Sequence, residues 1–430
     1  MFKKTLLIGL MLSFIVGAGV VQATEKIHLT IWSDWSGNIP IFQELMNIYM
    51  ERNPHVEITW EWSFGDHDKL VMSVISGTGP DIVCYGLVPE LIEDGMFEPL
   101  DKYLANSVLM EDIPPNLWPK TQWKGQTYGV PAIEGGPGWG LFYNKDRFGR
   151  AALPTPGPDE VLSIDDFLAL HAKLSNVGPD GVVTELGFYP PETNGHHYTR
   201  WEAFYNVKAV DLVNGKAQLD HPRMLAAAET LMRIYEIGGG RQAMLEFVGS
   251  SSLWPSMQSL FVTGKTAMMH AGYWAVSSLE SGGMSVDDYG VTWSPNIDGL
   301  KVQNYSGWQL LILSNCAHKE EAFKVVEFIA SGEGQAYIFE KLSWLGGMPR
   351  SLFDYVDVYA NPQIAWFLNS MFTADNTSGV ADLPNPYYNL TAQLWQDAFL
   401  KITSGEQSPV QALQEANRLL QLEIDATWEK

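Results

Sequence analysis

The stretch that ends at Trp274 contains a Gly-Lys-Thr tripeptide at positions 264–266, which is how a phosphate-binding loop ends. Such a loop also needs a glycine at the position of Ser259, because that glycine lets backbone N–H groups turn toward the phosphates. Serine occupies the position here, and we therefore exclude nucleotide binding. The tripeptide and the tryptophan that follows it need another explanation.

Tryptophan is the unusual component of the composition, with 16 among 430 residues. Its flat, rigid ring offers a large apolar face and one N–H donor at a small entropic cost on binding. A sugar ring presents the complementary surface, an apolar face surrounded by hydroxyl groups. Most of these tryptophans belong in a core, and the others indicate a carbohydrate ligand.

The adjacent pair His196–His197 is the most obvious candidate for a metal site. A metal site needs a third ligand at a fitting spacing, and none accompanies the pair, so we interpret it as part of a solvated loop. No nucleophile elbow and no Ser/His/Asp pattern occurs. We expect no metal, no cofactor and no catalytic residue.

Residues 1–23 have the three parts of a secretory signal peptide. Lys3 and Lys4 form a charged start, Leu6 to Val21 an apolar middle, and Ala23 ends a small-residue cleavage site. The polar residues that follow do not resemble the end of a membrane span. We therefore expect a periplasmic or secreted protein that is soluble once the peptide is removed.

The charge and the cysteines limit the partners and the chemistry. Removal of the signal peptide takes away two lysines and no acidic residue, which changes the net charge from −23 to −25. Such a chain repels nucleic acid and anionic lipid, and we expect a monomer with no nucleic-acid partner. No cysteine precedes Cys84, so we expect no lipid anchor. Cys84 and Cys316 can form one bridge or stay as two buried thiols, and we favour the thiols.

Strands and helices alternate through the first part of the chain, with strands predicted at 28–35, 56–62 and 80–86. This order predicts an open, mostly parallel α/β sheet with a ligand crevice at the carboxyl ends of its strands. The glycine-rich loop 133–140 is a connector or a hinge. Strand-like segments return near 290–313, after a more helical stretch, so we expect two lobes connected by several crossings with a cleft between them.

Eight segments carry a resemblance, in chain order: LTIWSDWSG, ERNPHVEI, SGTGPDIV, IEDGMFEPLDKYL, KGQTYGVPAIEGG with FYNKDRF, FVTGKTAMMHAGYWA, YGVTWSP and KEEAFKVVEFIASGEGQ. Together they resemble the extracellular solute-binding proteins, family 1, a maltose-binding-protein-like family that serves ABC importers of sugars. The resemblance implies a two-lobed periplasmic binding protein fold with multiple hinge crossings and a ligand cleft between the lobes.

In this family the pattern that runs here from Phe261 to Trp274 is a strand-and-helix element beside the cleft, and its tryptophan stacks on a sugar. The resemblance therefore implies that Trp274 is a binding residue. It implies further ligand contacts at seven positions: Asp34, Trp35, Tyr85, Glu134, Trp201, Trp308 and Trp344.

We divide the chain accordingly. The signal peptide takes residues 1–23, the N-terminal lobe takes 24–133 and 295–342, and the C-terminal lobe takes 134–294 and 343–430. The function that the resemblance implies is capture of a sugar or oligosaccharide in the cleft and its delivery to the permease subunits of an ABC importer in the inner membrane, without catalysis.

Two alternatives stay open. A secreted glycoside hydrolase would also be rich in aromatic and acidic residues, but it needs two carboxyl groups at a defined separation, which sequence cannot locate. The same fold could bind a non-sugar solute such as glycerol phosphate or a polyamine. An anionic ligand would need convergent arginines, and the candidate cleft segments offer few, with Arg200 and Arg350 nearest. A neutral carbohydrate is the ligand that we favour.

The signal peptide gives the first testable prediction. Export of the full-length chain should yield a mature protein that begins at Thr24, because the small-residue site ends at Ala23. N-terminal sequencing and intact mass of the exported protein measure this. A chain that keeps residues 1–23 and fractionates with the membrane would contradict the prediction.

Overall fold

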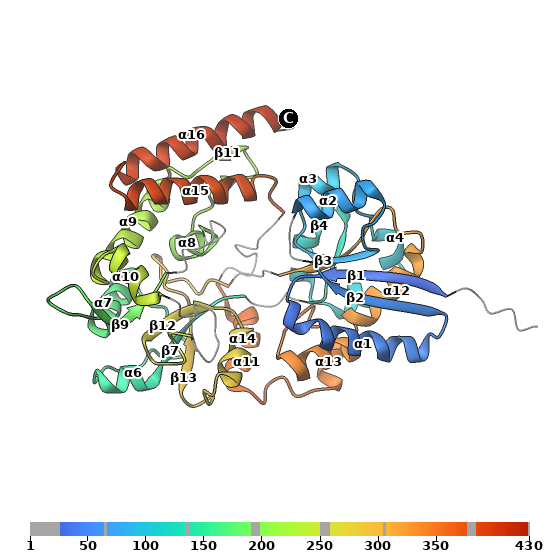
Figure 1. The fold of residues 1–430 in the computed structure, drawn as a ribbon, viewed down its shortest axis with the longest axis horizontal. Helices are drawn as coiled ribbons and strands as arrows, with labels where there is room; N and C mark the ends of the chain where they lie inside the picture. Colours follow the sequence, from blue (N-terminus) through green and yellow to red (C-terminus); the bar gives the residue numbers. More distant parts are fainter. Residues whose placement is uncertain are drawn as a thin grey trace, which may run out of the picture.

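The computed structural model describes residues 26–63, 67–133, 138–190, 198–249, 259–303, 307–375 and 384–428. These residues fold into two α/β lobes that lie side by side, each with its own five-stranded sheet (Figure 1). No helix in those ranges combines the length and the apolar character that a bilayer span requires. The predicted signal peptide, the His196–His197 pair and Glu134 lie outside the described residues.

The first sheet has the strand order β2-β1-β3-β14-β6. Its strands are β1 (Ile27–Ser33), β2 (Val56–Trp62), β3 (Ile82–Tyr85), β6 (Gly129–Pro131) and β14 (Gln309–Ile312). β1 runs parallel to β2 and β3, whereas β14 runs antiparallel to β3 and β6. The ends of β1, β2, β3 and β6 and the start of β14 therefore share one edge, which we call the first-sheet edge.

Both faces of the first sheet are covered, as the apolar run of β3 predicts. Ile82 belongs to one buried cluster and its neighbour Val83 to another, because successive side chains of a strand point to opposite faces. Helix α1 packs below β1 and β2, and α2 and α3 lie above them (Figure 1). The helices of this lobe are α1 (Ile39–Arg52), α2 (His67–Ser76), α3 (Pro89–Glu93), α4 (Asp101–Leu104), α5 (Leu109–Asp112), α12 (Lys319–Ala330) and α13 (Gly332–Leu342).

The second sheet has the strand order β13-β7-β12-β9-β8. Its strands are β7 (Gly140–Asn144), β8 (Asn176–Val177), β9 (Val183–Phe188), β12 (Thr266–Ala271) and β13 (Tyr289–Thr292). β7 runs antiparallel to β12 and β13, and β12 runs parallel to β9. The ends of β9, β12 and β13 and the start of β7 therefore share one edge, which we call the second-sheet edge.

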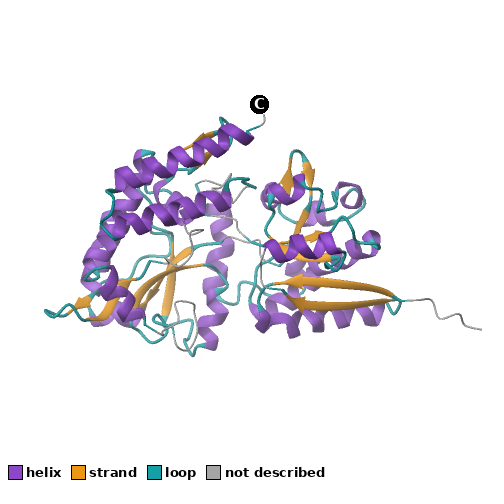
Figure 2. Ribbon diagram, turned by 45° about the horizontal axis from the view of Figure 1, so that its top comes forward, coloured by secondary structure: helices purple, strands orange, loops and turns teal. Residues whose placement is uncertain are grey.

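Helices surround the second sheet, and α15 and α16 form the outermost pair (Figure 2). The helices of this lobe are α6 (Lys145–Arg150), α7 (Ile164–Leu174), α8 (Tyr198–Tyr205), α9 (Pro222–Ile237), α10 (Arg241–Val248), α11 (Ala275–Ser281), α14 (Pro362–Thr373), α15 (Tyr388–Thr403) and α16 (Pro409–Thr427). Two of their ends follow sequence signals: Ser163 caps α7 by accepting the Asp166 N–H at 3.0 Å, and Gly238 follows the last residue of α9.

Two short hairpins also form where turn residues predict them. β4 (Gln122–Trp123) pairs with β5 (Gln126–Thr127) around Lys124-Gly125, and β10 (Val210–Asp211) pairs with β11 (Lys216–Ala217) around Asn214-Gly215. Gly125 and Gly215 both have positive φ, which is the conformation that such turns require.

The crossings between lobes connect the two sheet edges directly. Residues 132–139 lead from the end of β6 to the start of β7, and residues 293–308 lead from the end of β13 to the start of β14. A third segment follows α13 and leads to α14, which contacts β13. The predicted two-lobed α/β fold with several crossings is confirmed, and both sheet edges border the crossings.

The cysteines lie in the first lobe. Cys84, on β3, and Cys316, shortly after β14, are both buried, and no disulfide joins them. Burial, with the Asp81 carboxylate beside it, raises the pKa of the Cys316 thiol to about 12. That thiol therefore stays protonated at neutral pH.

A buried histidine ties three elements of the second lobe together. His171, on α7, is 0% exposed. Its Nδ1 accepts the N–H of Phe188 at 3.0 Å, so Nε2 carries the proton and donates it to the Ile234 carbonyl at 3.1 Å. Burial lowers the pKa of His171 to about 4. The neutral imidazole thus connects α7, β9 and α9.

This pKa predicts an acid-sensitive contribution to stability. Between pH 6.5 and pH 4 the unfolded chain binds a proton at His171 and the folded chain does not, so the free energy of unfolding falls as the pH is lowered through this window. The loss from this residue should reach about 3 kcal/mol. Urea denaturation at pH 7 and pH 4.5 measures it. His171→Gln should reduce the change in the free energy of unfolding between these two pH values, and His28→Gln, at an exposed position, should not. If wild type and His171→Gln showed the same change with pH, the assignment of this effect to His171 would be refuted.

Candidate functional site

Four of the predicted aromatic binding residues gather at the first-sheet edge. Trp35 follows β1, and Tyr85 ends β3. Trp308 directly precedes β14, and because Gln309 pairs with Tyr85, the antiparallel register places Trp308 at the same edge. Trp344 follows α13 and packs against Phe42 of α1.

These four rings contact one another edge to face, and we call them the first aromatic cluster. The ring centroids of Trp35 and Trp308 are 5.4 Å apart, those of Trp35 and Trp344 are 5.0 Å apart, and those of Tyr85 and Trp308 are 5.2 Å apart. Trp344 is buried, and the other three rings are partly exposed. Each edge-to-face contact is worth about 0.5–1.5 kcal/mol, so the rings hold one another in place.

Asp34 shapes the turn that carries Trp35. Its Oδ1 accepts the N–H of Trp35 at 2.9 Å, and the Trp35 carbonyl accepts the N–H of Asn38 at 2.8 Å. Trp35 has φ 62 and ψ 62, a left-handed conformation that residues other than glycine rarely adopt. Such strain is kept where the surrounding structure enforces it, often at a binding site. The carboxylate has acceptor sites left for a ligand hydroxyl.

Trp274 lies at the second-sheet edge, just after β12. Because Ala271 pairs with Gly140, the antiparallel register brings Trp274 beside Trp139, which directly precedes β7. The two ring centroids are 4.9 Å apart. Trp139 also stacks on His270, at 5.4 Å and an interplanar angle of 10°.

Trp201 lies deeper in the second lobe. It sits on α8, is 6% exposed, and contacts Phe204 at 5.5 Å, and Phe204 in turn contacts His270 at 5.0 Å. We call Trp139, Trp201, Phe204, His270 and Trp274 the second aromatic cluster. Trp201 supports this cluster from the core side, whereas Trp139 and Trp274 are only partly buried.

The glycine of the Gly-x-Trp motif has a steric role. A Cβ on Gly272 would lie 2.0 Å from the Trp274 ring and 2.4 Å from the Gly138 carbonyl oxygen. The indole thus folds back over the backbone of Gly272, which only a residue without a side chain permits. Gly264, in the tripeptide, has φ +69 and forms a turn that leads into β12 rather than into a helix. This geometry agrees with the exclusion of a phosphate-binding loop.

Sequence reasoning overlooked Trp139 as a part of this edge, and it named Arg200 only as one of the two arginines nearest the candidate cleft segments. The Arg200 guanidinium carbon lies 4.0 Å from the centroid of the Trp139 ring, and burial lowers the pKa of Arg200 to about 9. Trp139 ends the glycine-rich crossing loop, and an aromatic residue in a loop between two sheets was the available signal. Arg350, in contrast, is exposed at the start of the 3₁₀ helix η5 (Arg350–Asp354).

Hydrogen bonds hold the crossing segments beside these clusters. The N–H of Trp139 donates to Gln303 Oε1 at 3.0 Å, and Gln303 Nε2 donates to Ser370 Oγ of α14 at 2.7 Å. A Cβ on Gly346 would lie 2.2 Å from the carbonyl oxygen of Ala132, so the third crossing packs closely on the first. Hydrogen bonds and close packing therefore hold the crossing segments against one another.

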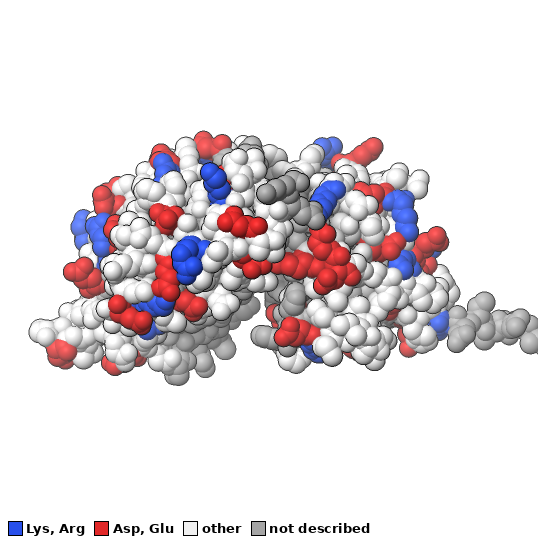
Figure 3. Space-filling model, turned by 90° about the horizontal axis from the view of Figure 1, so that it is seen from above, with Lys and Arg blue, Asp and Glu red and all other residues white. Residues whose placement is uncertain are grey.

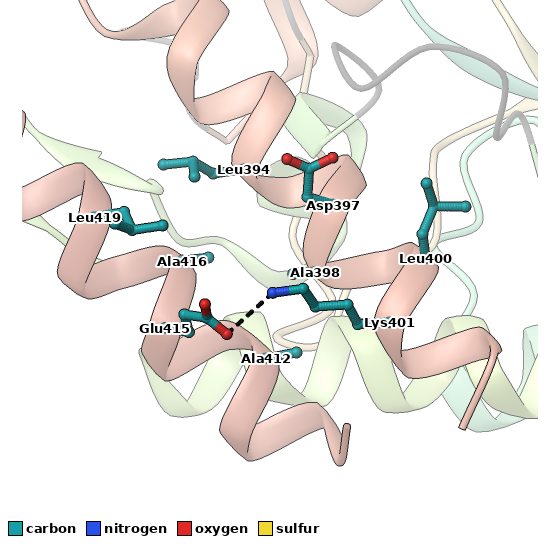
Figure 4. A pocket seen from close by; sticks show the side chains of 9 residues that line it. All are labelled: Leu394, Asp397, Ala398, Leu400, Lys401, Ala412, Glu415, Ala416 and Leu419. Atoms are coloured by element: carbon teal, nitrogen blue, oxygen red, sulfur yellow. Dashed lines mark hydrogen bonds and ion pairs between the residues drawn. The ribbon is translucent and has the colours of Figure 1, made fainter. Parts of the chain in front are cut away.

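A cavity of about 270 Å³ lies between α15 and α16, and the ion pair of Lys401 with Glu415, at 3.0 Å, crosses it (Figure 4). Neither aromatic cluster contributes to its lining. Among the described residues, no group of three or more His, Cys, Asp or Glu side chains is arranged to hold a metal ion.

Two lobes with separate sheets, several crossings, and aromatic side chains at both sheet edges beside the crossings define a two-lobed binding protein. A family model for bacterial extracellular solute-binding proteins matches residues 35–336. The chain belongs to this family, as the resemblance of its motifs implies.

Known proteins of the same kind support the assignment. A binding protein of Brucella abortus (strain 2308) is 24% identical over 341 residues, which cover 78% of this chain and 78% of the relative. The maltotriose-binding protein of Pyrococcus abyssi (strain GE5 / Orsay) is 23% identical over 313 residues, which cover 70% of this chain and 62% of the relative. The structure of CpMnBP1 with mannobiose bound is similar in fold, with a TM-score of 0.79 at 22% identity, covering 92% of this chain and 100% of that chain.

The packing of Trp274 on Gly272 gives a testable prediction. Gly272→Ala should displace the indole and destabilise the protein by about 1–3 kcal/mol, the usual cost of overpacking. Thermal unfolding and the tryptophan emission spectrum measure the two effects. Gly149→Ala is the control, because a Cβ there has no neighbour within 4 Å. Gly272→Ala with wild-type stability and emission would show that the ring does not need this space.

Proposed function

We propose that this protein binds a sugar or an oligosaccharide between its two lobes and delivers it to the permease of an ABC importer. The observation that carries the proposal is the presence of an aromatic cluster at each of the two sheet edges that border the crossings. Tryptophan faces suit the apolar faces of sugar rings. The mannobiose and maltotriose named for similar proteins support this ligand class.

In the proposed site, Trp35, Tyr85 and Trp308 contribute from one lobe and Trp274 from the other. Trp344 and Trp201 hold these rings from behind, and Asp34 accepts hydrogen bonds from sugar hydroxyls. Glu134, at the first crossing, is proposed to accept further hydroxyl hydrogen bonds. Each stacked ring is worth about 1–2 kcal/mol of binding free energy.

Binding proceeds by a shift between open and closed arrangements of the lobes. A ligand that contacts both clusters interacts more strongly with the closed arrangement and so increases its population. The permease then recognises that closed shape. The segments proposed to move together are 24–133 with 295–342, and 134–294 with 343–430, except that Trp344, whose ring contacts Trp35 and Phe42, is placed with the first group.

The proposal includes release without chemical change, export through the signal peptide at 1–23, and a soluble monomer with no lipid anchor. The surface charge supports a partner other than nucleic acid. On the face seen from above, acidic side chains gather near the seam between the lobes (Figure 3). Polyanions are repelled by such a surface.

Calorimetry with the mature protein and a panel of mono- and oligosaccharides tests the proposal. Binding should be stoichiometric, and the saccharide should be recovered unchanged. Trp274→Ala should weaken binding about tenfold or more, because it removes one stacked face. Trp123→Ala, in the β4–β5 hairpin, is the control and should bind normally. Hydrolysed product would overturn the proposal. Wild-type affinity of Trp274→Ala would remove this residue from the proposed site.

A further inference from the structure

Trp62 is the last residue of β2 and lies at the first-sheet edge. The register pairs it with Ser33 of β1, and the N–H of Ser63 donates to the Ser33 carbonyl at 2.9 Å, so the two strands stay paired up to this edge. β1 and β2 run toward the second lobe, and their ends lie on the side of the first lobe that faces it (Figure 1). Trp62 therefore lies on the side of its lobe where the ligand is proposed to bind.

The exposure of Trp62 sets it apart from the other tryptophans. It is 52% exposed, whereas every other tryptophan among the described residues is buried or partly buried. A single exposed apolar side chain is common on a protein surface and needs no ligand to explain it. A tryptophan, however, offers one of the largest apolar faces that a side chain can present. Trp62 thus presents a larger face to solvent than any ring of the first aromatic cluster.

The side chain of Trp62 lies on the face of the sheet that carries this cluster. Alternation along β2 places Trp62 on the same face as Trp60. Trp60 is 3% exposed and stacks on Phe42 of α1, with ring centroids 4.7 Å apart. Phe42 also contacts Trp344, which contacts Trp35. Trp35 packs against the same buried cluster as Trp60, so Trp62 follows on the face where the first aromatic cluster is anchored.

The strand order arranges the aromatic residues of the first-sheet edge in a row. Trp62 ends β2, Trp35 follows β1, Tyr85 ends β3 and Trp308 precedes β14, and these four strands are successive neighbours in the sheet. Neighbouring strands are about 4.8 Å apart, so the three spacings from β2 to β14 amount to roughly 14 Å. That length exceeds a single sugar ring and suits a chain of linked sugars. Because β2 is the outermost strand, Trp62 marks the outer end of the row.

We propose that Trp62 forms an outer sugar-binding subsite, and that the ligand is an oligosaccharide that extends along the first-sheet edge as far as β2. This inference rests on the proposed function. Sugars at Trp35 and Trp308 occupy the inner part of the row, and a terminal sugar stacks on Trp62. Each stacked sugar adds apolar burial, so affinity increases with chain length until the outer subsite is filled. A monosaccharide leaves Trp62 uncovered.

Calorimetry of the mature protein with oligosaccharide ladders tests the inference. The probes are malto- and manno-oligosaccharides, from the monosaccharide to the hexasaccharide, followed by the ladder of any other sugar that binds in the panel above. The longest members should bind the wild type at least about tenfold more tightly than the disaccharide. Trp62→Ala should remove most of this advantage and change the affinity for the disaccharide by less than about twofold. Trp62→Phe keeps a smaller aromatic face and should keep part of the advantage.

Two further variants separate an effect on chain length from a general loss of binding. Trp35→Ala, in the inner part of the row, should weaken all members of the ladder to a similar extent. Trp123→Ala removes a tryptophan from the β4–β5 hairpin of the same lobe and should keep the wild-type length profile. Thermal unfolding of each variant verifies the fold, and Trp62→Ala should unfold at the wild-type temperature because its ring is more than half exposed. Trp62→Phe provides the test if Trp62→Ala does not fold.

The outcomes separate the inference from the function beneath it. Affinity that stops increasing at the disaccharide, or binding of monosaccharides alone, would overturn the outer subsite and leave sugar binding intact. An unchanged length profile in Trp62→Ala, or an equal loss at every length, would also overturn it. Binding of no saccharide at all would overturn both proposals.

Discussion

The antiparallel insertion of β14 into the first sheet is the constraint on which the molecule depends. This strand pairs with β3 and β6, so a segment from late in the chain completes a sheet built from its beginning. Gly129 makes the pairing possible, because a Cβ there would lie 2.9 Å from the Cβ of Gln309. The chain must therefore leave the first lobe and return to it. The return also places Trp308 beside Tyr85. The pairing of β14 with β3 thus requires the crossings and also brings the aromatic side chains together at the first-sheet edge.

The second sheet also contains antiparallel pairing between strands that are far apart in the chain. Antiparallel pairing of β7 with β12 brings together two tryptophans that are far apart in sequence, Trp139 and Trp274. Each lobe thus presents a rigid set of rings, already in contact with one another, at the edge that borders the crossings. Rings that are fixed before a ligand arrives lose little conformational entropy on binding. In the proposed mode of binding, affinity then depends mainly on how the two edges approach each other.

Local patterns predicted the elements better than they predicted the contacts. The alternation of VEITWEW, the turns at Lys124-Gly125 and Asn214-Gly215, and the glycines after α9 all mark features that the structure contains. The family motifs additionally predicted the two-lobed fold. Trp139 and Arg200 were missed as a pair because their contact depends on the placement of α8 over the start of β7, which no local pattern encodes. Likewise, sequence could not separate Trp201, which is buried, from the partly exposed Trp274.

The position of the two thiols has a practical consequence for following the molecule's motions. Cys84 and Cys316 are the chain's whole complement of cysteine, both are buried in the first lobe, and no disulfide joins them. A thiol reagent can reach them only when the β3–β14 region opens, so its rate of reaction reports the free energy of that opening. The second lobe gives no signal in such an experiment, because both cysteines lie in the first lobe. The chain therefore contains a natural label that distinguishes unfolding of one lobe from unfolding of the whole protein.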